Sequence, residues 1–433
     1  MAAGRLDFRW FLAAALLAFP AWIGLRAVDL RQSRASLADA QADLEQGRYS
    51  LAARKLSDLV AGRPSTDEAW YLLGVCEAAR GRNDAAERAW ARVAPESSFA
   101  PRGIQGRMQL AAEAGRLAEA EAVVQQALAD PRIDGASLPI LLSPLFCQQG
   151  RLEETLRLLE ARWQALDDKG EGASEAAINL ARVHPELRLT PVPRQATQAA
   201  IEHAAGLAPD DDRVWLGRAN LALLEGKPDD ARRWLEACLK RRSDDPPVWR
   251  SWLAWAMEFG QAADVDRALE HLPAEGATTA DVRRIVAWRA ARLHDAAAEK
   301  EALERLIAVA PADRPALDRL ADLATREGDS AGAERMRRRK AEVDAKERRY
   351  RLLLARVQPL RDAAEMTGLA LDLGEWFEAR AFLRIVEAVD GDRAVARAVR
   401  ERLRAAPVSP GPSRGTLAAA VEAARSETGE EPR

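Results

Sequence analysis

The sequence predicts an all-helical solenoid built from about ten copies of one helix–turn–helix unit. Glycines recur along most of the 433 residues, and most neighbouring glycines of this series lie about 34 or about 68 residues apart. Alanine is abundant, whereas aromatic residues make up only 5% of the chain. Such a composition favours closely packed helices over a β-protein. The recurring glycines are Gly47, Gly81, Gly115, Gly150, Gly226, Gly260, Gly328 and Gly374, and His294 occupies the position midway between Gly260 and Gly328.

Residues of the same kind recur at constant sequence offsets from each of these glycines, as the unit at Gly81 illustrates. Gly74 precedes this glycine, Ala86 follows it, and Trp70 lies a further helical turn upstream. Glycine at this position is expected to end the first helix in the left-handed conformation, which is free of steric strain only without a Cβ atom. The small residues let two antiparallel helices approach closely, and the tryptophan is expected to fill the groove against the next helix.

The pattern resembles the tetratricopeptide repeat over roughly residues 36–390, with its strongest copies at 67–93, 212–239 and 247–272. This resemblance implies a right-handed superhelix whose concave side is lined by the first helix of each hairpin. Together with the N-terminal segment it suggests a membrane-anchored protein of the bacterial type.

Several units depart from the pattern. Ser143 and Thr155 replace small apolar residues in the unit at Gly150, and Glu299 does so in the unit at His294. The segment LTPVPR (189–194) stands where another hinge is expected. The resulting division is a short tail at 1–9, a transmembrane helix at 10–28, repeats at 36–173, a degenerate repeat with an insertion at 174–211, repeats at 212–346, a long helix with the last repeat at 347–404, and a disordered tail at 405–433.

Residues 10–25 (WFLAAALLAFPAWIGL) are uncharged and lie between Arg9 and Arg26. Extended to Val28, the run reaches the length of a membrane-spanning helix, so we expect an uncleaved signal anchor. A cleaved secretory signal is the alternative. Positive charges flank both ends, so orientation stays open. The periplasmic side is favoured for the repeats, and the cytoplasmic side remains an alternative.

The sequence contains no phosphate-binding loop, no zinc-ligand spacing and no nucleophile elbow, so we expect no catalytic residues, no metal and no cofactor. Asp210, Asp211 and Asp212 are interpreted as helix caps. With a net charge of −3, the chain has no general basic field for nucleic acid, and no small-molecule substrate is evident. The three cysteines, Cys76, Cys147 and Cys238, are expected to pack as small apolar residues.

Two further segments have open interpretations. The basic run at 336–351 suggests either a site for phosphate or anionic lipid, or a solvated helix face with pairs such as Arg338–Glu342 and Lys340–Asp344; we favour the second. It is expected to lie in a long helix. In the tail, LAAAVEAAR can form a short helix, in particular with a partner.

The predicted concave lining supplies the candidate partner-binding residues. By their offsets from the hinges, these are Tyr71, Leu72 and Val75; Leu216, Asn220 and Leu223; Arg250, Ala254 and Met257; and Arg284, Ile285 and Trp288. Among them, Tyr71, Asn220, Arg250, Met257, Arg284 and Trp288 are the proposed binding residues. Exposure to the groove is expected for Asn220, Arg250 and Arg284, and packing between repeats is expected for Leu72 and Leu223.

The sequence therefore favours a non-enzymatic, membrane-tethered scaffold that binds a protein or peptide in its concave groove. One alternative is a repeat module that assists a separate β-propeller of the ASPIC type, or a secretion or envelope-assembly protein. A secreted enzyme with a cleaved signal is the third hypothesis.

Overall fold

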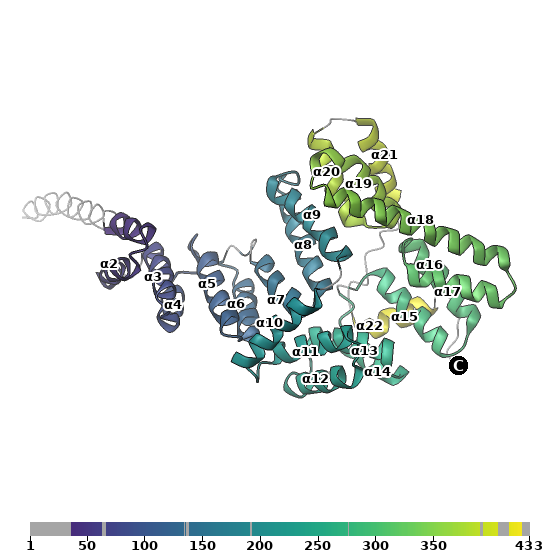
Figure 1. The fold of residues 1–433 in the computed structure, drawn as a ribbon, viewed down its shortest axis with the longest axis horizontal. Coiled ribbons are helices and arrows are strands. Elements are labelled where there is room, and N and C mark those ends of the chain that lie inside the picture. The colour runs from purple at the N-terminus through teal and green to yellow at the C-terminus, as the bar shows by residue number, and fades with distance from the viewer. Residues whose placement is uncertain are drawn as a thin grey trace, which may run out of the picture. The chain divides into compact units, whose positions relative to one another are not determined.

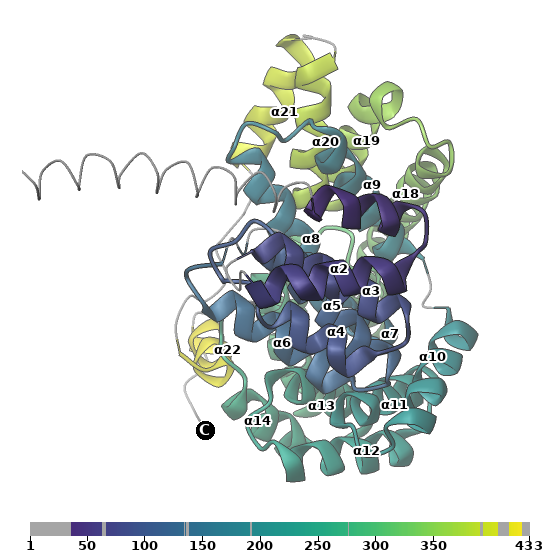
Figure 2. The ribbon, with the colours of Figure 1, turned by 90° about the vertical axis from the view of Figure 1, so that its left-hand side faces the viewer.

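The computed structural model describes residues 36–62, 66–133, 135, 138–190, 193–275, 277–389, 393–405 and 415–426. They fall into two compact units, the described residues up to 141 and those from 142 onward, which are treated separately. Figures 1 and 2 show the helices from two directions. None of the described helices is both long and apolar enough to span a bilayer. The anchor predicted at 10–28 lies outside the described residues.

The described residues form α-helices with a short 3-10 helix at Pro139–Leu142, and no β-strand. Residues 36–45 are helical. The first unit then contains α2 (Tyr49–Gly62), α3 (Asp67–Ala79), α4 (Asn83–Trp90), α5 (Ala100–Glu113) and α6 (Leu117–Ala129). The second contains α7 (Ser143–Gln148), α8 (Leu152–Asp167), α9 (Glu175–Leu189), α10 (Arg194–Leu207), α11 (Asp212–Leu224), α12 (Pro228–Arg241), α13 (Pro246–Phe259), α14 (Ala262–His271), α15 (Thr279–Arg292), α16 (Ala296–Val309), α17 (Arg314–Arg326), α18 (Ser330–Ala355), α19 (Pro359–Leu373), α20 (Trp376–Val389), α21 (Arg393–Ala405) and α22 (Leu417–Ser426).

Most of the predicted hinges have the expected left-handed backbone. At Gly81, φ is +71°, and the amides of Gly81 and Arg82 donate to the carbonyls of Ala78 and Glu77, which closes the last turn of α3. His294 adopts the same conformation with φ +58°. The prediction is confirmed for Gly47, Gly81, Gly115, Gly150, Gly226, Gly328, Gly374 and His294.

The hinge predicted at Gly260 is wrong in its conformation. Its φ is −89° and its ψ is −170°, which is an extended backbone. The next helix begins with a capping box, in which the Gln261 amide donates to Asp264 Oδ2 at 2.9 Å. This cap satisfies the start of α14, so the chain turns without a left-handed residue. A left-handed turn that lacks glycine occurs instead at Val357, where φ is +53°.

Polar substitutions in the pattern are accommodated by local partners. The buried hydroxyl of Thr155 donates to the Arg151 carbonyl at 3.1 Å. Glu299 is 4% exposed and forms an ion pair with Arg319, with 2.5 Å between Arg319 Nε and Glu299 Oε1. The predicted cap is confirmed at Asp211, whose Oδ1 accepts the Arg213 and Val214 amides. A buried polar side chain is tolerated at these sites because its hydrogen bonds are made.

The basic run at 336–351 lies within α18. Several of its charges form ion pairs, but not with the partners that the sequence suggested. Lys340 Nζ lies 2.5 Å from Asp318 of α17, and Arg338 contacts Glu334. Arg349 is likewise paired with Glu365 of α19. These contacts tie α18 to both neighbouring helices, as expected for the charged face of a helix rather than for an anion site.

The interrupted repeat at 189–194 separates two helices that a regular repeat would pair. α9 packs against α8, α18 and α20, whereas α10 packs against α7 and α11 (Figure 1). The long-range contact of α9 with α20 joins parts of the second unit that are almost 200 residues apart in the sequence. Consequently α8 and α9 lie beside the C-terminal helices of this unit instead of continuing the stack.

Buried charged groups join α9 to α20. Glu378 is fully buried; its Oε1 lies 3.0 Å from His184 Nδ1, and Arg188 donates to both of its oxygens at 2.8 and 2.9 Å. Glu160 of α8 lies 3.1 Å from His184 Nε2. Burial raises the pKa of Glu378, but the hydrogen bonds from His184 and Arg188 outweigh it and lower the pKa below its usual value. The contact therefore depends on a carboxylate and a cation neutralising each other out of water.

In the first unit, one indole ring fills the space left by two glycines. Trp90 of α4 is 7% exposed, and its Nε1 donates to the Tyr71 carbonyl at 3.0 Å. A Cβ atom at Gly74 or Gly106 would lie 2.3 or 2.7 Å from this ring, whereas at Gly103 the nearest atom is 3.6 Å away. The small residue seven positions before the hinge thus serves a close approach, as the sequence predicted.

We expect Gly106→Ala to be about 1–3 kcal/mol less stable than Gly103→Ala, because only the former overpacks the anchored indole. Both substitutions gain the same helix propensity within α5, which makes them a matched pair. Urea denaturation followed by circular dichroism measures the difference. Equal midpoints would contradict the packing described for Trp90.

A second prediction concerns pH and the α9–α20 contact. Burial lowers the pKa of His184, but its hydrogen bonds with Glu160 and Glu378 outweigh this and raise the pKa above its usual value. A raised histidine pKa contributes stability that is complete below about pH 6.5 and is lost as the pH rises through the folded-state pKa. The chain should therefore be more resistant to urea at about pH 6 than at about pH 8 by a margin that His184→Gln reduces. Part of the margin should remain, because burial raises the pKa of the neighbouring Glu375 to about 7 and this group loses stability in the same direction.

The control is His203→Gln, which alters an exposed histidine of α10 and should keep the margin of the parent chain. A pH dependence that His184→Gln leaves unchanged would contradict the role given to this side chain.

Candidate functional site

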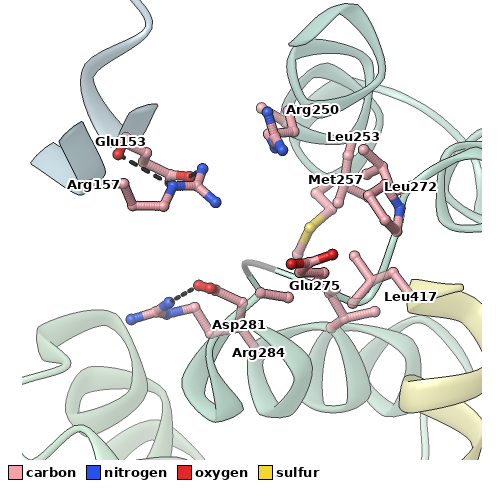
Figure 3. Close-up of a pocket in the computed structure, with 14 residues that line it drawn as sticks. Glu153, Arg157, Arg250, Leu253, Met257, Leu272, Glu275, Asp281, Arg284 and Leu417 are labelled. Atoms are coloured by element: carbon pink, nitrogen blue, oxygen red, sulfur yellow. Dashed lines mark hydrogen bonds and ion pairs between the residues drawn. The ribbon is translucent and has the colours of Figure 1, made fainter. Parts of the chain in front are cut away.

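The second unit contains a pocket of about 240 Å³ between α8, α13, α15 and the start of α22 (Figure 3). Its lining residues come from segments far apart in the sequence and combine apolar and charged side chains. They are Glu153, Arg157, Arg250, Leu253, Ala254, Met257, Leu272, Pro273, Glu275, Ala277, Asp281, Arg284, Ile285 and Leu417.

The orientation of α13 follows from its three tryptophans. Trp249, Trp252 and Trp255 are buried, at 1%, 1% and 5% exposure, and form the inner face of this helix. The helical period then places positions 250, 253, 254 and 257 on the opposite side, toward the pocket. Arg250 remains about one-third exposed, and its Nη1 lies 3.3 Å from Glu154 Oε2. Burial lowers the pKa of Arg250, but a guanidinium stays charged at neutral pH.

Asp281 and Arg284 of α15 form the charged edge opposite α13. Asp281 Oδ2 accepts the Thr278 amide at 2.8 Å and so caps the start of the helix. Its Oδ1 accepts Arg284 Nη1, also at 2.8 Å. Arg284 Nε donates in addition to Asp313, the N-cap residue of α17, at 2.8 Å. Burial lowers the pKa of Arg284, but these carboxylates outweigh that effect and raise the pKa above its usual value, so the arginine is both charged and fixed in place.

The third side of the pocket belongs to α8. Glu153 is 84% exposed, and its Oε2 lies 3.8 Å from Arg157 Nη2, a distance typical of a weak, solvated ion pair. Figure 3 shows both side chains facing the arginines of α13 and α15 across the opening. Sequence reasoning missed these two residues, because they lie in the second helix of a hairpin and reach the pocket only through the contact of α9 with α20.

The floor of the pocket is apolar. It is bordered by Leu253 and Met257 of α13, by Leu272 at the end of α14, and by Leu417 of α22. Its volume is below the roughly 300–1,000 Å³ of pockets that enclose a drug-sized ligand. A space of this size, with an apolar floor and a rim of both charges, suits one or two side chains of a peptide.

The structure brings together three of the six proposed binding residues. Arg250, Met257 and Arg284 line the pocket, as do the neighbouring groove positions Ala254 and Ile285. Trp288 lies beside them but is half-buried, and its Nε1 donates to the Met257 carbonyl at 2.8 Å, so it braces α13 against α15.

The expectation for Asn220 is wrong, since this residue is not exposed to a groove. It is 9% exposed, and its side chain donates to the Gln149 carbonyl at 2.8 Å, beside the hinge at Gly150. Leu216, another predicted groove position, is fully buried. The α7 hinge covers Asn220, whereas Leu216 belongs to the hydrophobic core of the second unit. Leu72 and Leu223 are packed against their cores, as expected.

Tyr71 belongs to the first unit and is treated with it. It is half-buried, and its ring stacks on Phe99 with 5.6 Å between centroids. Cys76 and Cys238 are buried as predicted, and burial raises their pKa to about 11 and about 12, whereas Cys147 is half-buried. Among the described residues, no group of histidine, cysteine and acidic side chains has the arrangement of a metal site.

A model of the tetratricopeptide repeat family matches residues 37–101 and 194–246. A relative named cellulose synthase operon protein C, from Xanthomonas axonopodis pv. citri (strain 306), is 28% identical over 254 residues. The match covers 57% of this chain and 17% of the relative, so the chain spans less than a fifth of that protein's length.

Solved structures with similar folds include the Cut9–Hcn1 assembly of the APC/C, with 14% identity, a TM-score of 0.31, and coverage of 98% of this chain and 97% of that one. The C-terminal part of a repeat protein from Cytophaga hutchinsonii has 12% identity, a TM-score of 0.28, and coverage of 66% and 99%. Yeast Tom70 has 10% identity, a TM-score of 0.25, and coverage of 87% and 88%. The family match is confined to these two segments, and the described residues as a whole form an all-helical solenoid that resembles tetratricopeptide repeats.

Proposed function

We propose that this protein is a non-enzymatic scaffold that binds a peptide segment of a partner protein in the pocket between α8, α13 and α15. The observation that carries the proposal is the convergence of Arg250, Met257 and Arg284 on one small cavity with an apolar floor. Tetratricopeptide repeats generally bind protein or peptide partners, which supports this assignment.

The rim of the pocket indicates the kind of segment that fits. Arg250 and Arg284 are each already held by a carboxylate, so an incoming acidic side chain exchanges one ion pair for another and gains little net energy. Affinity then comes from the apolar floor, and the charges determine how the bound segment is positioned along the pocket. The expected ligand is a segment with one bulky apolar side chain between charged residues of both signs.

The proposal includes no catalytic step. Catalysis by acid and base needs groups whose protonation is free to change near neutral pH. In this pocket Arg250 and Arg284 stay charged, and Asp281 is engaged by a helix start and by Arg284. These contacts fix a surface and are consistent with recognition.

We further propose that residues 10–28 tether the protein to a membrane, with the repeats on the periplasmic side. The apolar run between Arg9 and Arg26 supports the tether. A second candidate role is assembly of an envelope polysaccharide system, and the observation that favours it is the resemblance to a protein named for a cellulose synthase operon.

The pocket proposal predicts that Arg250→Ala combined with Met257→Ala reduces recovery of the bound partner at least about tenfold. The double variant loses both the apolar contact of Met257 and the charge of Arg250 that positions the segment. The measurement is quantitative mass spectrometry of proteins that co-purify with the full chain from native membranes. The control is Arg335→Ala, which removes an exposed arginine of α18 outside the pocket. If every co-purifying protein is recovered equally with the double variant and the control, the pocket is not the binding site.

The tether predicts that a reporter fused after residue 406 is active only on the periplasmic side and stays with membranes after alkaline carbonate extraction. Deletion of residues 2–28 should release it from the membrane fraction, since no described helix is able to span a bilayer. Cytoplasmic reporter activity would contradict the orientation, and carbonate extraction of the intact fusion would contradict the tether.

A further inference from the structure

The C-terminal helix α22 packs in the middle of the helical array rather than at its end. It contacts α14 and α15, although residues 279–292 and 417–426 are far apart in the sequence (Figure 1). Helices as short as these ten residues are marginal in isolation, so docking is what holds the segment helical. The docking surface is called here the α14–α15 groove, defined by Leu272–Ala274, Asp266, Arg283, Val286 and Arg289.

Backbone pairing fixes the entry to this groove. The Ala274 amide donates to the Gly415 carbonyl at 2.9 Å, and the Leu417 amide donates to the Leu272 carbonyl at 2.8 Å. Pro273 and Thr416 form an antiparallel bridge between these two bonds. Such backbone pairing supplies affinity that does not depend on the side chains of the bound segment.

Apolar side chains on one face of α22 provide the next contacts. Leu417, Val421 and Ala424 are buried, at 5%, 0% and 8% exposure, and they follow the spacing of a single helix face. Ala423, between them, is exposed. This is the arrangement by which an amphipathic helix lies in a groove.

Two arginines of α15 complete the recognition. Arg289 Nη1 donates to Glu422 Oε1 at 2.7 Å. Arg283 Nη1 donates to the Ala424 carbonyl at 3.1 Å and thereby caps the last turn of α22. The groove therefore contacts four features of the bound segment: an extended backbone edge, a row of apolar side chains, one acidic side chain and the C-terminal end of a helix.

An open cavity borders α22 at each end. The pocket of about 240 Å³ borders Leu417 at one end of the helix. A second cavity of about 330 Å³ borders Val421, Glu422 and Arg425 at the other end, against Val286 and Arg289. The alanine-rich α22 leaves both cavities unfilled, and a segment with larger side chains at these positions would bury additional apolar area in them.

We propose that the α14–α15 groove is a docking site for a partner protein's short amphipathic segment, and that α22 is a built-in competitor for it. The partner segment has an extended residue pair followed by a helix. Positions one, five and eight of that helix are apolar, and position six is acidic. Because α22 is covalently attached, it competes at an effective concentration on the order of millimolar. A partner with larger apolar side chains displaces it.

The test uses a fluorescein-labelled peptide with the sequence of residues 413–426 and the full chain in three forms. Ala424→Asp places a carboxylate on the buried face of α22 and should undock it, whereas Ala423→Asp makes the same change on the exposed face. The peptide is expected to bind Ala424→Asp at least about tenfold more tightly than the parent chain or Ala423→Asp. Adding Arg289→Ala to Ala424→Asp should weaken this binding, because the partner of Glu422 is removed.

Fluorescence anisotropy measures the binding. An absence of peptide binding to Ala424→Asp, or equal binding to all three forms, overturns the proposal. A parent-chain dimer in sedimentation that Ala424→Asp abolishes and Ala423→Asp keeps would assign the groove to the α22 helix of a second copy, and would also overturn it.

Amide hydrogen exchange of the parent chain gives a second, independent readout that needs no substitution. The amides of α22 should exchange at least about tenfold faster than those of α14 and α15, because a competitor opens locally. Exchange of all three helices as one unit would mean that α22 is a permanent part of the stack. These experiments leave Arg250 and Met257 unchanged, so their failure is distinguishable from failure of the proposed peptide pocket.

Discussion

The buried carboxylate of Glu378 constrains the arrangement of the second unit more than any other group. It has no exposure to water, and its charge is balanced by His184 and Arg188 of α9. Leaving a buried charge without its partners costs about 3–5 kcal/mol, so α20 is stable in this position when α9 lies against it. That contact also fixes α8, the helix before α9. The position of α8 at the pocket therefore depends on the buried ion pairs between α9 and α20.

The repeat itself was readable from the sequence because its physical requirements are local. A left-handed residue must end the first helix, so Gly81 and its counterparts mark the hinges, and Gly74 marks a close approach to Trp90. Gly260 shows the limit of this reasoning, since the Asp264 cap satisfies the turn by another route. The contact of α9 with α20 has no periodic signal. Glu378 looks like an ordinary charged helix residue until the distant partners are known.

The residues of the candidate site likewise fall into those that helix periodicity predicts and those that depend on long-range contacts. The face of α13 was predictable, because three buried tryptophans leave Arg250 and Met257 on the opposite side. The same periodicity predicted that Asn220 faces the groove, but the α7 hinge covers this residue. The repeat pattern did not predict that contact, because it depends on the interrupted repeat between α9 and α10. The helix-forming segment of the tail was visible in its composition, yet nothing in the sequence indicates that it docks between α14 and α15. Pattern therefore predicts faces of helices, and long-range contacts decide which faces meet.

The central claim is that α9 packs against α20 and so brings the end of α8 within side-chain reach of α20, and a zero-length cross-link tests it most directly. Arg384 of α20 lies 2.8 Å from Asp167 of α8, Nε to Oδ1. In an Arg384→Lys chain, a carbodiimide should join this lysine to Asp167 within the monomer, and mass spectrometry of the digest should identify the linked peptides. The parent chain, whose arginine does not react, is the control. A regular open superhelix would hold these helices apart, so the absence of this cross-link from a folded Arg384→Lys monomer would contradict the account.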